Sequence, residues 1–315
     1  MSVLTDSFES KSMITQQKTL KNSITFSGIG VHSGRKSVLT IHPAAPDAGY
    51  IFMRASNQAD QFRVGIIVPE AAMHATVYRH NGWMVSTVEH VMAALYALGV
   101  SNAIIELDGN EVPILDGSAL LFVQAIQADG LVMQDAPKKY LTPREQLTLQ
   151  DAGGRSLTID PAGDDYQLHV NYSGDFNHPL VGELSFQGTI TESFFAEQLA
   201  PARTFGFLEQ LPLLRKHNLA LGSSLGNTVV IGDEAMNDMR LPNECIRHKV
   251  LDLIGDLSLL GMPLIGTVRA HKTSHNFNRL VIEHFVQHPE LWYVTSPLES
   301  FETLTTFAPL DERQN

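Results

Sequence analysis

The segment that most limits how this chain can fold is residues 243–260, where apolar residues recur at helical spacing. The apolar stripe consists of Ile246, Val250, Leu253, Ile254, Leu257 and Leu260. His248, Asp252 and Asp256 follow one another at intervals of four, so a helix places them on one face, one turn apart. Because the stripe indicates a helix packed on a core, these polar groups lie beside apolar surface and need partners. The spacing of His248 and Asp252 can hold a metal, although alone it equally describes a local ion pair.

A second candidate cluster lies far upstream, where Glu89 and His90 open an Ala- and Leu-rich segment. Ser86 or Thr87 is expected to cap a helix over residues 88–98. An adjacent Glu-His pair suits a zinc hydrolase, because the imidazole can bind the metal while the carboxylate takes a proton from metal-bound water. For this pair alone, a carboxylate that complements the helix dipole and a packed histidine remain the structural alternative.

Together, His90, His248 and Asp252 form a set of two histidines and one carboxylate, which suits one catalytic Zn²⁺ with a coordination position left open. Cys245 is the single cysteine, so a cysteine-rich zinc site and an intrachain disulfide are both excluded. The chain has no H-E-x-x-H pattern either. Because the same ligand types also suit ferrous iron, Fe²⁺ stays open as an alternative metal.

Length and charge narrow the function classes. A chain of 315 residues with 43% apolar content can bury a large core and favours two domains. The formal net charge of −12 argues against a nucleic-acid partner. No apolar run has the length of a membrane span, and residues 1–15 do not resemble a secretory signal. We therefore expect a cytoplasmic enzyme that acts on a small molecule.

Strand and helix patterns alternate irregularly, which favours an α+β fold with helices on one face of each sheet. We expect a disordered tail at 1–15, an N-terminal domain at 16–136, a C-terminal domain at 137–305 and a second tail at 306–315. The polar stretch 135–139 is the expected linker. Strands are expected at 23–26, 37–42, 50–53, 65–68, 84–85, 102–107, 146–149, 156–160, 167–172, 181–186, 228–231 and 265–270, and helices at 118–128, 191–198, 207–216 and 274–287.

Three further positions suit the same chemistry. His275 follows the strand expected to end at Ala270, where a protonated imidazole could stabilise an oxyanion and then protonate a departing amine. Thr204 offers a hydroxyl donor beside aromatic residues, and Phe176 stands in a polar loop where it could stack on a base. A surface histidine, a helix start and a plain turn are the respective structural alternatives.

With these residues in place, the chain closely resembles the zinc-dependent UDP-3-O-acyl-N-acetylglucosamine deacetylases of lipid A synthesis in Gram-negative bacteria. The matching stretches run in the family's order from about residue 17 to 290. They are Gln17-Lys18-Thr19-Leu20, Gly28-Ile29-Gly30-Val31-His32-Ser33-Gly34, Ser86-Thr87-Val88-Glu89-His90, Val112-Pro113-Ile114-Leu115-Asp116-Gly117-Ser118, Asp175-Phe176-Asn177-His178-Pro179, Ala202-Arg203-Thr204-Phe205-Gly206-Phe207, Arg247-His248-Lys249 through Asp256, and Lys272 to His275.

The resemblance implies a role for each matching residue. The zinc ligands would be His90, His248 and Asp252, and the catalytic groups would be the general base Glu89, the general acid His275, its partner Asp256 and the oxyanion donor Thr204. The substrate contacts would be Lys249 and Lys272 near the nucleotide sugar, Phe176 at the base, and Phe205 and Phe207.

The resemblance also implies a fold and a reaction. The fold would be two α/β sandwich domains with the active site between them, each carrying a small insertion. The second insertion, about 207–242, would form a hydrophobic passage for the acyl chain. The reaction would remove acetate from UDP-3-O-acyl-N-acetylglucosamine, the committed step of lipid A biosynthesis. The enzyme would be a monomer without stable membrane insertion.

One alternative stays open, and the residues argue against a second. A zinc amidohydrolase acting on a different acylated nucleotide sugar would keep the same catalytic groups and alter the acyl passage. A non-catalytic paralogue would have lost at least one of these groups, and none is lost here. One departure from the family concerns His74, which stands where some members carry a cysteine near the metal, so a second, inhibitory metal site is in doubt.

Overall fold

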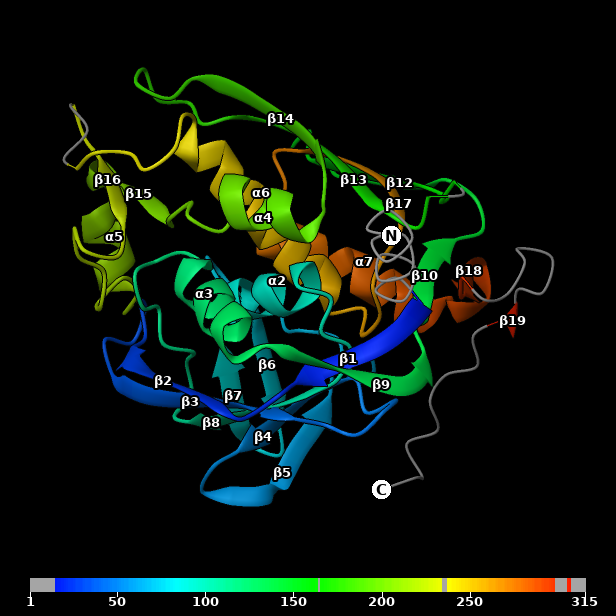
Figure 1. Ribbon diagram of the computed structural model, residues 1–315. Helices are drawn as coiled ribbons and strands as arrows, with labels where there is room; N and C mark the ends of the chain where they lie inside the picture. Colours follow the sequence, from blue (N-terminus) through cyan, green and yellow to red (C-terminus); the bar gives the residue numbers. More distant parts are fainter. Residues whose placement is uncertain (1–14, 164, 234–236, 298–304, 307–315) are drawn as a thin grey trace, which may run out of the picture.

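The computed structural model describes residues 15–163, 165–233, 237–297 and 305–306. The tails expected at 1–15 and 306–315 therefore lie almost wholly outside the described residues. Two sheets form the outer layers of the molecule, and helices lie between them (Figure 1). No helix within the described ranges has the length and apolar content that a bilayer crossing requires.

The first sheet has five strands in the order β2-β3-β8-β4-β5. These are β2 (Ile24–Ile29), β3 (Lys36–Pro43), β8 (Ala103–Asp108), β4 (Tyr50–Arg54) and β5 (Asn57–Arg63). Only the central pair β4–β8 is parallel; the other neighbours are antiparallel. Helices α2 (Glu89–Ala97) and α3 (Leu120–Asp129) cover its inner face (Figure 1). Alternate residues of β3 and β8 are buried, as expected for a sheet packed on one side.

The second sheet repeats this arrangement, with the order β11-β12-β17-β13-β14. The strands are β11 (Leu147–Gln150), β12 (Ser156–Asp160), β17 (Gly266–His271), β13 (Leu168–Asp175) and β14 (Glu183–Thr189). Again only one pair of neighbours is parallel, namely β13 with the central strand β17. Its helices are α4 (Glu192–Gln198), α6 (Glu244–Ser258) and α7 (His275–Gln287). The α+β prediction is thus confirmed, and the repeat lies in topology rather than in sequence.

Each half carries an added element before its first central helix. In the first half this is the hairpin β6 (Val77–His80) and β7 (Trp83–Ser86). In the second half it is β15 (Phe205–Phe207), the 3₁₀ turn η1 (Leu208–Gln210), α5 (Leu211–Lys216) and β16 (Val229–Ile231). The remaining elements are β1 (Gln16–Leu20), β9 (Leu131–Pro137), β10 (Tyr140–Pro143), η2 (Pro289–Leu291), β18 (Trp292–Thr295) and β19 (Thr305–Thr306).

Helices α2 and α6 meet in the middle of the molecule, backbone against backbone. A Cβ added to Gly255 of α6 would lie 2.1 Å from the carbonyl oxygen of Glu89. Only glycine therefore permits this approach, which sets the first turn of α2 beside the polar face of α6. The surrounding core is continuous across both halves and includes Val91, Leu253 and Leu257.

Three local predictions were wrong. The expected linker 135–139 is largely the end of β9, which pairs with β1 at the edge of the first half. No strand forms at 65–68; the strand is the polar, largely exposed β5, whose edge position removes the apolar alternation that would mark it. The side chain of Thr87 does not cap α2, because its backbone is left-handed (φ 57°) and its hydroxyl donates to Glu111 Oε1 at 3.2 Å.

Candidate active site

Three potential metal ligands converge where α2 and α6 meet. His90 lies in the first turn of α2, while His248 and Asp252 lie one turn apart on α6. Asp252 Oδ1 is 3.6 Å from His90 Nε2 and 3.3 Å from His248 Nε2. One donor atom from each residue lies within 4.8 Å of the other two, and all three residues are buried.

The chemistry of these donors fits a metal ion. Asp252 Oδ1 is buried and has no hydrogen-bond partner, which is costly unless a cation satisfies it. His248 Nδ1 lies 3.0 Å from the carbonyl oxygen of Ala202 and donates to it, so the lone pair of Nε2 faces Asp252. Burial lowers the pKa of His248 to about 4, which keeps the imidazole neutral, as a metal ligand must be.

Glu89, His275 and Asp256 form an acid–base group beside these donors. His275, the first residue of α7, places Nδ1 2.9 Å from Asp256 Oδ2 and Nε2 3.9 Å from Glu89 Oε1. The backbone N–H of Thr76 donates to Glu89 Oε2 at 3.2 Å, which leaves Oε1 facing the histidine. The Thr76 hydroxyl and the Asn278 amide both donate to Asp256, at 2.5 and 2.8 Å.

For Glu89 and His275, burial and the nearest opposite charges act on the pKa in opposite directions, and the net result is a raised pKa for both. Burial raises the pKa of Glu89, which makes its carboxylate a stronger base. Burial by itself would lower the pKa of His275, but attraction to Asp256, Glu89 and Asp252 outweighs it and raises the value to about 9. At neutral pH the imidazole of His275 is therefore protonated and can donate a proton.

A second group of donors, formed by Glu89, Asp256 and His275, also meets the distance requirement for a metal. It is better suited to proton transfer, because the His275 imidazole is protonated and Asp256 already accepts three hydrogen bonds. Neither donor group found among the described residues includes His74. That residue lies on the cavity wall with a left-handed backbone (φ 63°), and its carbonyl oxygen accepts from His32 Nε2 at 3.1 Å.

Comparison with known proteins places this site in a family. The family model for LpxC, UDP-3-O-acyl N-acetylglycosamine deacetylase, matches residues 17–287. The chain belongs to the LpxC family. It is 39% identical over 291 residues to the UDP-3-O-acyl-N-acetylglucosamine deacetylase of Syntrophotalea carbinolica, covering 90% of this chain and 92% of that protein. The enzyme of the same name from Pseudomonas entomophila is 38% identical over 287 residues, covering 89% and 93%.

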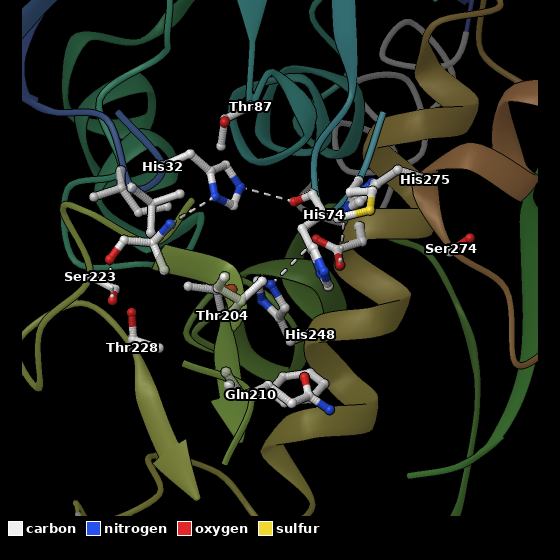
Figure 2. A pocket seen from close by; sticks show the side chains of 18 of the residues that line it. His32, His74, Thr87, Thr204, Gln210, Ser223, Thr228, His248, Ser274 and His275 are labelled. Carbon is white, nitrogen blue, oxygen red and sulfur yellow. Dashed lines mark hydrogen bonds and ion pairs between the residues drawn. The ribbon is translucent and has the colours of Figure 1, made fainter. Parts of the chain in front are cut away.

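The LpxC site opens into a cavity of about 500 Å³. Figure 2 shows His248, His275 and Thr204 around this cavity, contributed by α6, α7 and the residue before β15. The insertion of the second half supplies most of the apolar wall, with Phe207, Leu208, Leu211, Leu214, Ala220 and Val230. Phe205 joins this wall, and its ring centroid lies 6.2 Å from that of His248.

The expected substrate contacts separate into two groups. Lys249 lines the cavity, but its ammonium already donates to Asp252 Oδ2 at 2.7 Å. It therefore neutralises the charge of that carboxylate. Lys272 and Phe176 do not line the cavity; they lie beyond neighbouring ends of the parallel strands β17 and β13. Lys272 pairs with Asp175 at 3.4 Å, and the Phe176 ring packs edge-on against Phe205 at 5.5 Å.

Several residues of the site escaped the sequence analysis. Thr76 and Asn278 hold Asp256, and the carbonyl of Ala202 orients His248. No periodic pattern marks Thr76 or Asn278, and a backbone carbonyl such as that of Ala202 has no sequence signature. Arg155, beside the turn between β11 and β12, also lines the cavity and pairs with Asp151 at 2.6 Å. The sequence marks Arg155 only as a basic residue in a chain with a formal net charge of −12.

Proposed function

We propose that this chain hydrolyses the acetamide of UDP-3-O-acyl-N-acetylglucosamine to give acetate and a free amine, the committed step of lipid A biosynthesis. The observation that carries the proposal is the unpartnered oxygen of Asp252, which faces two histidine nitrogens beside a buried base and a protonated histidine. Family membership and the names of the relatives support the substrate.

In the proposed mechanism, Glu89 and His275 move the protons. Glu89 removes a proton from the attacking water; its anchored Oε2 keeps Oε1 directed at the reacting atoms. His275 stabilises the developing oxyanion with its positive charge and then protonates the departing amine from Nε2. Asp256 holds Nδ1 of the same ring and so fixes which nitrogen delivers the proton.

Thr204 and the metal ligands complete the proposed site. The Thr204 hydroxyl, which lines the same cavity as His275, would donate to the oxyanion. His90, His248 and Asp252 would hold one Zn²⁺, with Fe²⁺ as the alternative. When bound, the ion supplies Lewis acidity, which lowers the pKa of water and polarises the carbonyl.

The proposal is tested by following acetate release from UDP-3-O-acyl-N-acetylglucosamine together with metal content. Glu89→Gln and His275→Ala should each lower kcat by at least about a hundredfold while the metal stays bound. Glu106→Gln, which removes a carboxylate of the first sheet that faces His42 rather than the cavity, should retain full activity. Near-normal turnover by either catalytic variant with its metal retained would contradict the roles assigned here.

The apolar insertion would take the acyl chain, and chain length separates the proposed substrate from another acylated nucleotide sugar. Leu214→Trp fills the cavity wall, so KM for long-chain substrates should rise about tenfold or more, while short-chain substrates change less. Leu213→Trp is the matched control, because that neighbouring side chain is 60% exposed and does not line the cavity. Equal effects of both variants at every chain length would argue against an acyl passage here.

Lys272 and Phe176 would contact the nucleotide from the strand ends, and Lys249 would act through Asp252 and the sugar. The domains would span 16–136 and 137–305, with the passage insertion at 207–242. We also propose a monomer that works in the cytoplasm.

A further inference from the structure

The segment 200–204 connects His248 to the first half of the chain, although only one of its residues has a proposed chemical role. The Ala202 carbonyl accepts from His248 Nδ1 at 3.0 Å, and Thr204 lies on the cavity wall. Two backbone hydrogen bonds tie the segment to the first half of the chain: Thr204 N–H to the Gly117 carbonyl at 2.7 Å, and Ala119 N–H to the Ala200 carbonyl at 3.1 Å. A small displacement of this segment would therefore move a metal ligand and the oxyanion donor together.

A buried ion pair fixes the middle of this segment to α6. Glu244, the first residue of that helix, is fully buried, and its Oε1 accepts from both the backbone N–H and Nε of Arg203 at 2.9 Å. Arg203 Nη2 also donates to the carbonyl of Asp238 at 2.6 Å. Since Glu244 stands one turn before His248, the same part of α6 holds both the histidine and the segment 200–204 that orients it.

A second carboxylate extends this network into the first half. Asp116, in the loop after β8, pairs with Arg240 Nη1 at 2.5 Å, and the backbone N–H of Arg240 donates to Glu244 Oε2 at 2.6 Å. The loop is tightly seated, because a Cβ on Gly117 (φ 85°) would lie 1.7 Å from the carbonyl oxygen of Asn227. Asp116 of the first half and Glu244 of the second therefore both bind Arg240, and Glu244 also binds Arg203 of segment 200–204.

We propose that Glu244 and Asp116 are positioning residues, which hold segment 200–204 so that the Ala202 carbonyl orients His248 and the Thr204 hydroxyl faces the reacting carbonyl. The role given to Thr204 rests on the proposed function, whereas the orientation of His248 by the Ala202 carbonyl does not. It also explains the Asp116-Gly117-Ser118 stretch, because this loop docks the first half onto segment 200–204, whose Ala202 carbonyl orients His248. Partners that orient a metal ligand typically change metal affinity or activity by about 10- to 100-fold when they are removed.

The first test titrates the metal-free full-length chain with Co²⁺ and follows its visible absorption. In Glu244→Gln, which keeps the shape and removes the charge, we expect Co²⁺ affinity to fall about 10- to 100-fold with an altered absorption spectrum. In the zinc-loaded enzyme kcat should fall by a similar factor, while KM stays within about threefold because segment 200–204 acts on the transition state.

The second test uses Arg240, whose side chain is 32% exposed, so its replacement should leave folding intact. Arg240→Met should lower kcat about tenfold with KM unchanged, and Arg240→Lys, which can still reach Asp116, should recover most of that loss. Asp160→Asn is the matched control: it removes a carboxylate from the Arg269 ion pair on the second sheet, away from the cavity.

The outcomes separate positioning from a purely structural role. If Glu244→Gln matches Asp160→Asn in Co²⁺ affinity, spectrum and kcat, the positioning role is wrong, however far its melting temperature falls. Equal kcat losses in Arg240→Lys and Arg240→Met would overturn the part assigned to Asp116. A wild-type chain that binds Co²⁺ but releases no acetate from the nucleotide sugar would overturn the proposed function alone, since the Co²⁺ titration still reports on His248.

Discussion

The buried charges of the site lie beside opposite charges, whereas the buried ammonium of Lys138 lies beside a carbonyl. In the site, Asp252, Asp256 and His275 each have an oppositely charged neighbour within 3.6 Å. Lys138 is different: its ammonium is buried with a carbonyl partner, Gly99 O at 3.4 Å, and lies 5.5 Å from the Tyr140 ring centroid. Burial, and then repulsion by Lys18, lower the pKa of Lys138 to about 8. This residue therefore costs stability whenever it is charged.

Lys138→Met should stabilise the protein at pH 7, by up to about 3 kcal/mol for a pKa lowered this far. Between about pH 8 and the unfolded value of 10.5, the unfolded wild-type chain holds a proton that the folded chain has lost. Wild-type stability therefore rises with pH across this window, and the advantage of the variant shrinks. Urea unfolding of both proteins at pH 7 and pH 10 measures the difference.

The exposed neighbour Lys139 provides the control for this measurement. Its side chain is 53% exposed, so Lys139→Met should change stability little and without this pH dependence. An advantage for Lys138→Met that stays constant from pH 7 to pH 10 would show that burial of the charge is not its cause.

At the scale of elements, the contact between α2 and α6 creates the site. His90 belongs to one helix and Asp252 to the other, so their 3.6 Å separation depends on how closely the helix axes approach. Gly255 sets that approach, since any larger residue meets the Glu89 carbonyl. The same contact fixes Glu89, the proposed general base, and His90, a proposed metal ligand, because both lie in the first turn of α2.

Gly255→Ala should therefore force the helices apart at the site. We expect a loss of about 1–3 kcal/mol in the free energy of unfolding, typical of an overpacked core, and a fall in kcat of about tenfold or more. Gly163→Ala, where an added Cβ meets nothing within 4 Å, should leave both quantities unchanged. Unaltered kcat in Gly255→Ala would mean that helix spacing does not control the catalytic geometry.

At the scale of the whole molecule, the proposed metal site joins the two halves. His90 comes from the first repeat and His248 with Asp252 from the second, so a bound ion would cross-link domains that are far apart in sequence. A ligand that binds only the folded state stabilises it in proportion to the logarithm of its concentration over Kd.

Chelation should consequently lower the melting temperature, and added Zn²⁺ should restore it. At a metal concentration about one hundred times Kd, the folded state gains about 2.7 kcal/mol. His90→Ala removes the contribution of the first half, so its melting temperature should respond much less to Zn²⁺. Calorimetric scans with and without chelator check this, and an equal response from His90→Ala would exclude that residue as a ligand.

Much of the site could be predicted because its groups fall into short local clusters, although the clusters themselves are far apart in the chain. The spacing of His248, Asp252 and Asp256 on one helix follows from about 3.6 residues per turn, and the adjacency of Glu89 and His90 needs no fold at all. The α+β class followed from mixed strand and helix patterns. Edge elements such as β5 and β9 were missed because partly exposed strands lose the apolar alternation on which prediction depends.

The amino-acid sequence by itself determined which chemical groups the chain carries and which of them share a helix face, since local spacing fixes direction along a helix. The tertiary structure alone decided that α2 meets α6 at Gly255, that Asp252 keeps one oxygen without a hydrogen bond, and that Arg203 is held by Glu244. These contacts join residues far apart in the chain, and they exist only because two sheets bury their helices against each other.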